Sequence, residues 1–131
     1  MDAKQLASMP LFADLDKRER KRVAERADEV DVPAGKKLAN QGDLAYEFFV
    51  IEDGTARVEH AGADGTATLG PGDFFGEIGL LEQDHRRTAT VVAETPMRLM
   101  VLTGADFRVL NRELPEVGEK VGSAMRERLG G

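Results

Sequence analysis

The chain has 131 residues, 41% of them hydrophobic, with a formal net charge of -6 at pH 7 and no cysteine. This length suffices for one hydrophobic core, so we expect one domain over residues 1–131, and the acidic charge argues against general nucleic-acid binding by this chain alone. The sequence lacks a signal-peptide pattern and an apolar run of the ~18 residues that span a membrane, so we expect a cytoplasmic protein with no membrane contact.

Residues 1–28 have the pattern of helical segments. A short apolar stripe at their start is expected to dock on the core: Leu6, Met9, Leu11 and Phe12. Pro10 interrupts any helix there, because it lacks an N–H. Asp16, with Glu19 three residues later, forms a capping-box pattern that predicts a helix over residues 16–28.

Between residues 30 and 102 the chain switches to short β segments separated by turn residues, which indicates a sandwich or barrel. Asp53-Gly54 predicts a hairpin that joins the strand 48–51 to the strand 55–59. Asp64-Gly65 predicts another hairpin. Thr95-Pro96 is expected to connect a last pair of strands, 88–93 and 97–102.

The residues after Thr103 return to a helical pattern. Asp106, three residues on, fits a helix cap at Thr103, and Pro115 can open a second helix. The second helix carries an apolar stripe consisting of Val117, Val121, Met125 and Leu129. It also carries two glycines that each cost ~1 kcal/mol relative to alanine. We therefore expect C-terminal helices over residues 103–129, the second of them marginally stable and able to move.

The stretch from Gly72 to Thr90 has the residues of a phosphate cradle. Gly76 precedes a predicted helical turn over 77–82, whose unpaired N–H groups can bind a phosphate oxygen. Arg87 can add two parallel charge-assisted hydrogen bonds, and Thr88 adds a hydroxyl beside it. Glu77 would repel a phosphate, but it can accept a hydrogen bond from a ribose 2′-OH. A nucleotide offers both groups.

The run from Phe75 to Leu80, followed by Arg87-Thr88-Ala89-Thr90-Val91, resembles the phosphate-binding cassette of cyclic nucleotide-binding domains. The resemblance covers nearly the whole chain, because Gln41-Gly42-Asp43, Asp53-Gly54 and Gly72-Asp73-Phe74 also occupy the family's positions. It implies an α+β fold, an antiparallel β-roll or jelly-roll barrel flanked by N- and C-terminal helices. The ten residues from glutamate to arginine match bacterial catabolite-activator-type regulators.

The resemblance also assigns ligand contacts. It implies Arg87 on the cyclic phosphate, Glu77 on the ribose 2′-OH and the backbone amides of Gly76, Glu77, Ile78 and Gly79 around the phosphate. Arg87 is preferred to Arg86, because Thr-Ala-Thr follows it. Thr88 would lie beside the phosphate. The alternation of residues 56–59 directs Val58 into the core, where it can also line the base pocket.

The resemblance implies a cyclic nucleotide sensor that binds cAMP, with cGMP as the alternative, and that switches its C-terminal helices. No cofactor is expected. His60 and His85 are the only histidines and no cysteine is present, so neither metal nor nucleophilic catalysis has support. We therefore expect that the protein is not an enzyme.

The alternative function is a ligand-independent interaction module in which Glu77 and Arg87 pair with each other. We expect a monomer or weak homodimer, with a protein partner or output domain reached through the C-terminal helix.

Overall fold

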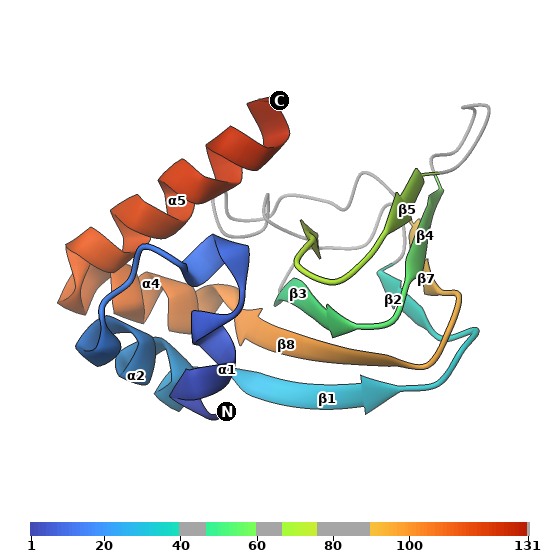
Figure 1. The fold of residues 1–131 in the computed structure, drawn as a ribbon, viewed down its shortest axis with the longest axis horizontal. Coiled ribbons are helices and arrows are strands. Elements are labelled where there is room, and N and C mark those ends of the chain that lie inside the picture. The colour runs from blue at the N-terminus through green and yellow to red at the C-terminus, as the bar shows by residue number, and fades with distance from the viewer. Residues whose placement is uncertain (40–46, 60–66, 76–89, 131) are drawn as a thin grey trace.

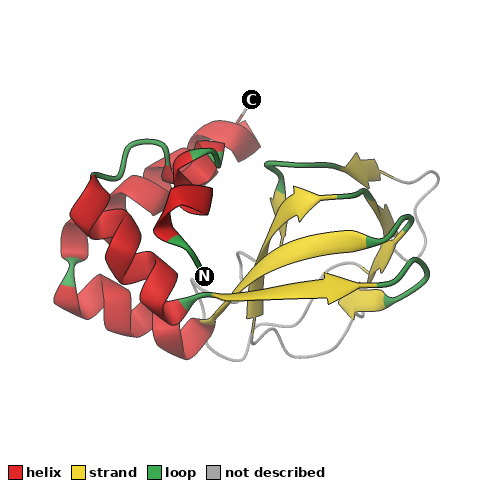
Figure 2. Ribbon diagram, turned by 60° about the horizontal axis from the view of Figure 1, so that its bottom comes forward, coloured by secondary structure: helices red, strands yellow, loops and turns green. Residues whose placement is uncertain are grey.

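The computed structural model describes residues 1–39, 47–59, 67–75 and 90–130, and the side chains up to residue 124. Figures 1 and 2 show the helices gathered at one end of the molecule and the strands at the other. The described helical segments are α1 (Ala3–Ala7), the 3₁₀ turn η1 (Pro10–Phe12), α2 (Lys17–Arg26), α4 (Gly104–Glu113) and α5 (Pro115–Gly130). None of the helices in this described part is long and apolar enough to cross a membrane.

The described strands form two four-stranded sheets, here called sheet A and sheet B. Sheet A has the order β1-β8-β3-β6, and its strands are β1 (Asp28–Val32), β8 (Met97–Thr103), β3 (Glu47–Asp53) and β6 (Phe74–Phe75). Sheet B has the order β2-β7-β4-β5, and its strands are β2 (Lys37–Ala39), β7 (Thr90–Ala93), β4 (Ala56–Glu59) and β5 (Ala67–Leu69). All described pairings are antiparallel. The β-roll flanked by helices is confirmed, but the described strands form two sheets and not a closed barrel.

Two predicted strand pairings are wrong. Asp53-Gly54 does not close a hairpin, because β3 pairs with β8 and β6 while β4 pairs with β5 and β7. Likewise, Thr95-Pro96 connects β7 of sheet B to β8 of sheet A. Both turns therefore cross between the sheets. The pairing of β4 with β5 is confirmed, although the Asp64-Gly65 turn lies outside the described residues.

Burial explains why these turns cross. Consecutive residues from Phe48 to Ile51 are buried, as are those from Leu99 to Leu102. Strands buried on both faces need cover on both sides. In sheet A, one face packs against the helices through Phe48, Val50, Phe74, Met100 and Leu102, and the other packs inside the roll through Phe49, Ile51, Phe75, Leu99 and Val101.

The helix starts follow from local capping. Asp16 accepts a hydrogen bond from the Glu19 amide at 2.8 Å, and the Glu19 carboxylate accepts one from the Asp16 amide at 2.8 Å. The hydrogen bond from the Glu19 amide also lowers the pKa of Asp16. Thr103 caps α4 by accepting from the Asp106 amide at 3.1 Å. Both predicted caps are confirmed, and α2 ends at Arg26, two residues before the predicted boundary.

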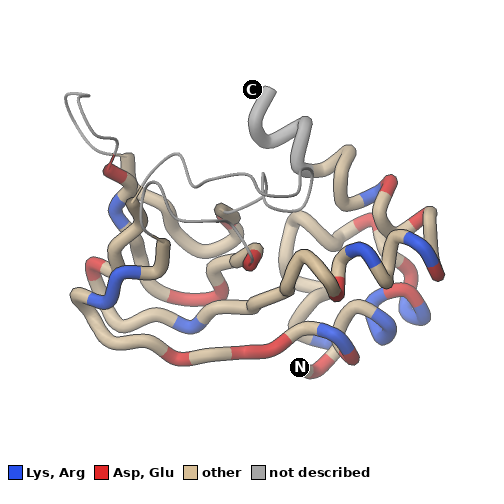
Figure 3. The backbone as a smooth tube through the Cα atoms, turned by 180° about the vertical axis from the view of Figure 1, so that it is seen from behind, with Lys and Arg blue, Asp and Glu red and all other residues tan. Residues whose placement is uncertain are grey.

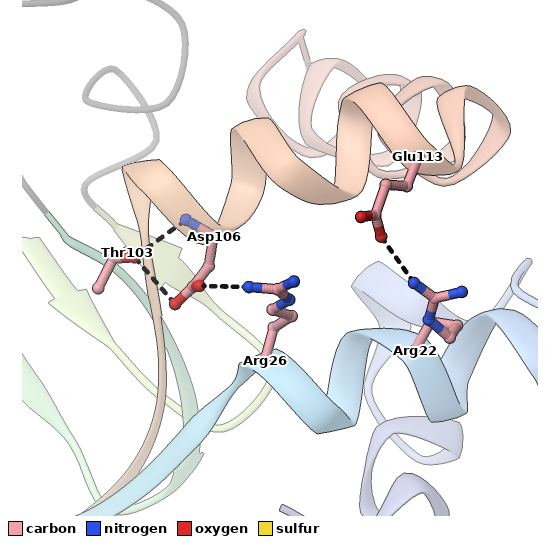
Figure 4. Close-up of polar contacts among 5 residues, drawn as sticks. All are labelled: Arg22, Arg26, Thr103, Asp106 and Glu113. Atoms are coloured by element: carbon pink, nitrogen blue, oxygen red, sulfur yellow. Dashed lines mark hydrogen bonds and ion pairs between the residues drawn. The ribbon is translucent and has the colours of Figure 1, made fainter.

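Among the described side chains, three ion pairs fasten the C-terminal helices to α2. Arg22 lies 2.7 Å from Glu113 and Arg26 lies 3.5 Å from Asp106, so two turns of α2 contact both ends of α4 (Figure 4). Lys120 of α5 lies 2.7 Å from Glu19. Apolar residues of all these helices, including Val23, Leu110, Val117 and Val121, complete one cluster with the outer face of sheet A. The helices therefore form one packed layer.

Candidate functional site

The turn before the predicted cassette is fixed by hydrogen bonds. The Gly70 amide donates to the Asp73 carboxylate at 2.8 Å, and the Asp73 amide donates to the Gly70 carbonyl at 3.0 Å. Gly72 has a φ of 90°, a conformation that favours glycine. Two further bonds join the turn to β3, from the Ile51 amide to Asp73 at 2.9 Å and from the Gly72 amide to Ile51 at 2.8 Å. The turn therefore starts the cassette from a fixed position beside β3.

Two aromatic residues lead from the turn into the cassette, and they face opposite sides of sheet A. Phe75 stacks on Phe49 inside the roll, with ring centroids 4.7 Å apart. Phe74 faces the helices and packs beside Phe48, at 5.8 Å. The first residues of the cassette region therefore contact both the interior of the roll and the helical layer.

The segment 76–89 begins and ends on different sheets. Phe75 belongs to β6 of sheet A and Thr90 to β7 of sheet B, where Thr90 is the register partner of Glu59. Six predicted ligand residues fall in this segment and lie outside the described residues: Gly76, Glu77, Ile78, Gly79, Arg87 and Thr88. Their contacts with a ligand remain predictions. The described residues show where the segment leaves one sheet and joins the other.

Val58 is the predicted ligand residue that the structure describes. It lies on β4 between Ala67 and Val91 and packs partly buried against the interior cluster. Ala56, two residues earlier, is fully buried, while Arg57 pairs with Glu59 at 2.7 Å. The predicted alternation of β4 is therefore confirmed. Val58 faces the interior that also contains Phe75, and its contact with a base remains a prediction.

Charged groups of sheet A gather where β1, β8 and β3 run side by side. Arg98 binds Asp31 through two hydrogen bonds, of 2.9 Å and 3.4 Å, and the guanidinium lowers the pKa of this aspartate. Burial, together with the hydrogen-bonding neighbour Glu29, raises the pKa of Glu52 to about 7. The described residues contain no group of three or more histidine, cysteine or acidic side chains placed to hold a metal ion.

Sequence comparison gives the family. A sequence model described as the cyclic nucleotide-binding domain matches residues 29–113, well over half of the chain. The chain belongs to the cyclic nucleotide-binding domain family. The match runs from β1 to the end of α4, so it contains both sheets and the segment between Phe75 and Thr90.

Two relatives of this cyclic nucleotide-binding domain are parts of different kinds of protein, a kinase regulatory subunit and a potassium channel. A cAMP-dependent protein kinase regulatory subunit from Schizosaccharomyces pombe is 34% identical over 95% of this chain and 29% of its own length. A cyclic nucleotide-gated potassium channel from Rhizobium etli is 35% identical over 96% of this chain and 35% of its own. The chain thus spans about a third of these curated relatives.

A solved structure supports the same assignment. The catabolite activator protein from Thermus thermophilus is 33% identical, with a TM-score of 0.78 over 92% of this chain and 58% of its own. The resemblance to catabolite-activator-type regulators is therefore confirmed in both sequence and fold.

Sequence reasoning missed two acidic residues of this domain. Glu19 was predicted as part of a cap, but its ion pair with Lys120 joins residues 101 positions apart, and no local pattern signals such a contact. Glu52 follows the buried run of β3, where the pairing register with β8 shifts between Ile51 and Asp53. A carboxylate directly after four buried residues was the available signal, but the sequence does not show the shift that places it.

Proposed function

We propose that this cyclic nucleotide-binding domain binds cAMP between its two sheets and acts without catalysis. The main support for this proposal is that the segment 76–89 follows Phe75 of sheet A and precedes Thr90 of sheet B, next to the interior that contains Val58. A segment anchored in this way can place Glu77 and Arg87 beside one ligand. The kinase regulatory subunit named for cAMP supports the choice of nucleotide.

Each ligand group has a proposed partner. Arg87 binds the cyclic phosphate with two charge-assisted hydrogen bonds, and the backbone amides of residues 76–79 complete the cradle. Thr88 adds a hydroxyl at the phosphate. Glu77 accepts from the 2′-OH, the one ribose hydroxyl that a 3′,5′-cyclic nucleotide leaves free. Val58 contributes apolar surface beside the base.

We further propose that binding moves the C-terminal helices. Phe74 directly precedes Phe75 at the start of the segment and packs in the same cluster as Leu110 of α4 and Val117 of α5. A shift at the cassette therefore reaches the helical layer through one side chain. The moved helix α5 would pass the signal to a protein partner or output domain. We infer that residues 1–131 act as one regulatory unit, a monomer or weak homodimer.

Titration calorimetry with four nucleotides tests the ligand. We expect binding of cAMP, weaker binding of cGMP, and little binding of AMP, which lacks the cyclic phosphate. We expect 2′-deoxy-cAMP to bind at least tenfold more weakly than cAMP, because it leaves the Glu77 carboxylate without its donor. Equal affinity for cAMP and 2′-deoxy-cAMP would show that Glu77 does not bind the ribose 2′-OH. No heat with any of the four would instead favour a ligand-independent interaction module.

A further inference from the structure

A pocket of about 340 Å³ lies between the N-terminal segments and sheet A, and no predicted ligand residue is among its described lining. Its lining comes from α1 and η1, from β3, and from the turn before β6: Gln5, Ser8, Met9, Pro10, Ile51, Glu52, Pro71 and Gly72. Glu52 is the one charged residue in this lining. It continues the helix-facing side of β3 after Phe48 and Val50, at the position where the register with β8 shifts.

The charged groups that face Glu52 come from the other strands of sheet A. They are Glu29 and Asp31 of β1 and Arg98 of β8, while the pocket residues of α1, η1 and the turn are uncharged. Arg98 is already bound to Asp31 by two hydrogen bonds. Glu29 lies on β1 and Glu52 on β3, the two strands that flank β8, and the two carboxyl groups interact. Figure 3 shows the acidic positions along β1 beside the charged positions of the neighbouring strands.

Two carboxylates cannot form a hydrogen bond while both are ionised, because each only accepts. The Oε2 atom of Glu52 is buried and has no donor among the described residues. A proton on one of the two carboxyls would supply the missing donor. Burial and the interaction with Glu29 raise the pKa of Glu52 to about 7, so this proton can be gained and lost near neutral pH.

Glu29 also contacts the N-terminal helix. Its Oε2 accepts a hydrogen bond from Nε2 of Gln5 in α1 at 2.9 Å. On the opposite side of the pocket, a side chain added at Gly72 would lie 3.5 Å from the Pro10 ring, so η1 packs directly against the turn. The same turn is hydrogen-bonded to Ile51, the residue before Glu52. The acidic pair is therefore connected to α1, to η1 and to the turn that precedes the cassette.

We propose that Glu29 and Glu52 share a proton and that this proton fastens α1 and η1 to sheet A, as a pH-sensitive latch. With the proton present, Glu52 bonds to Glu29, and Glu29 holds Gln5. Without it, two negative charges face each other beside a pocket that water can enter, and the contact with α1 weakens. Neither Glu29 nor Glu52 is among the predicted ligand residues, so the latch can be measured without nucleotide.

The direction of the pH dependence follows from the raised pKa. The ordinary pKa of a glutamate in the unfolded chain is 4.5, and that of folded Glu52 is about 7, so the folded state binds this proton more tightly. The stabilisation is complete below about pH 4.5 and is lost as the pH rises through about 7. Asp31 has the opposite dependence, because Arg98 lowers its pKa, and its contribution changes only below pH 3.8.

Urea unfolding without nucleotide, between pH 5.5 and 8.5, measures this dependence. For the wild type we expect the equilibrium constant for unfolding to rise about thirtyfold over this range, as a pKa raised from 4.5 to about 7 requires. Glu52→Gln should remove most of this rise, because its amide donates to Glu29 at every pH. Glu94→Gln is the matched control, since Glu94 is exposed in the turn between β7 and β8, and it should keep the wild-type profile. Identical profiles for Glu52→Gln and the wild type would overturn the latch.

Carbon-13 NMR of the glutamate carboxyls gives a direct test on the wild type, even if Glu52→Gln fails to fold. We expect one glutamate to titrate with a midpoint near pH 7, and the amide signals of Gln5 and Ser8 to shift with that same midpoint. Glu29→Gln should lower the midpoint of the remaining glutamate. If every glutamate titrates below pH 5.5, or if the α1 amides do not follow the titration, the proposal is wrong.

Discussion

Lys120 of α5 donates a hydrogen bond from Nζ to Oε1 of Glu19, 2.7 Å away, and the Glu19 side chain is only 6% exposed. The same oxygen accepts from the Asp16 amide at the start of α2. The bond to Glu19 raises the pKa of Lys120. One buried carboxylate thus serves two purposes, as part of the cap of α2 and as the anchor for α5.

We expect Glu19→Ala to lower the free energy of unfolding by about 2 kcal/mol, because it removes one half of the capping box and leaves Lys120 without its acceptor. Glu25→Ala is the matched control on the same helix. Its side chain is 56% exposed and lies 3.7 Å from Arg22, so the loss should be under about 0.5 kcal/mol. Urea unfolding compares the two variants. Equal losses would show that the burial of Glu19 adds nothing.

Local patterns in the sequence predicted local structure well. The capping box at Asp16, the cap at Thr103, the alternation of β4 and the helix opened by Pro115 were all found, because each depends on residues within four positions. The two hairpins were wrong, since a turn signal specifies a reversal of the chain but not the sheet that the next strand joins. That choice depends on covering both faces of β3 and β8, which only the whole fold supplies.

For the candidate site too, the local features could be predicted from the sequence and the long-range contacts could not. Residue identity and spacing were enough to name the family, and Val58 could be placed on the interior face of β4 from alternation alone. Glu52 could not be found, because its environment is built by Glu29, by Arg98 and by a register shift, and these lie far from it in sequence. Contacts between charged residues that lie far apart in the sequence therefore could not be predicted from local patterns.

The turn between β3 and β4 gives a stability prediction. Gly54 has a φ of 92°, and an added Cβ would lie 2.5 Å from the Pro96 carbonyl and 2.8 Å from the Met97 side chain. We expect Gly54→Ala to cost about 3 kcal/mol, from the backbone conformation and this overlap together. Gly35 has a φ of 88° with nothing within 4 Å, so Gly35→Ala should cost only about 1 kcal/mol. Thermal unfolding that ranks the two variants in the reverse order would contradict this explanation.

Ligand binding should change the helical layer if the proposed switch operates. We expect cAMP to alter amide hydrogen exchange in α4 and α5 as well as between Gly72 and Thr90, because coupling requires contacts that differ between two states. Phe74→Leu should reduce the change in hydrogen exchange in α4 and α5 and should leave the change between Gly72 and Thr90 unaltered. Exchange mass spectrometry resolves both regions. Protection confined to 72–90 would mean that the domain binds its ligand without switching.

The two adjacent arginines should have unequal effects on binding. Arg87→Ala should lower the affinity for cAMP by more than a hundredfold, equivalent to about 3 kcal/mol, because it removes a charged bidentate contact. Arg86→Ala is the control and should change the affinity less than threefold. Calorimetry measures both, with circular dichroism to confirm folding. Similar losses from the two substitutions would show that the role of Arg87 has been assigned to the wrong residue or is shared.

Base selectivity should be modest. Thr88 can place its hydroxyl on the phosphate of either nucleotide, or on the 2-amino group of guanine when cGMP is in the syn conformation. We expect a preference for cAMP over cGMP of about tenfold or less, which corresponds to about 1.4 kcal/mol, the scale of one neutral hydrogen bond. Competition binding with both nucleotides measures this ratio. Thr88→Ala should weaken both nucleotides alike if the hydroxyl contacts only the phosphate, and cGMP more if it contacts guanine. A thousandfold preference in the wild type would require a base-reading residue other than Thr88 and Val58.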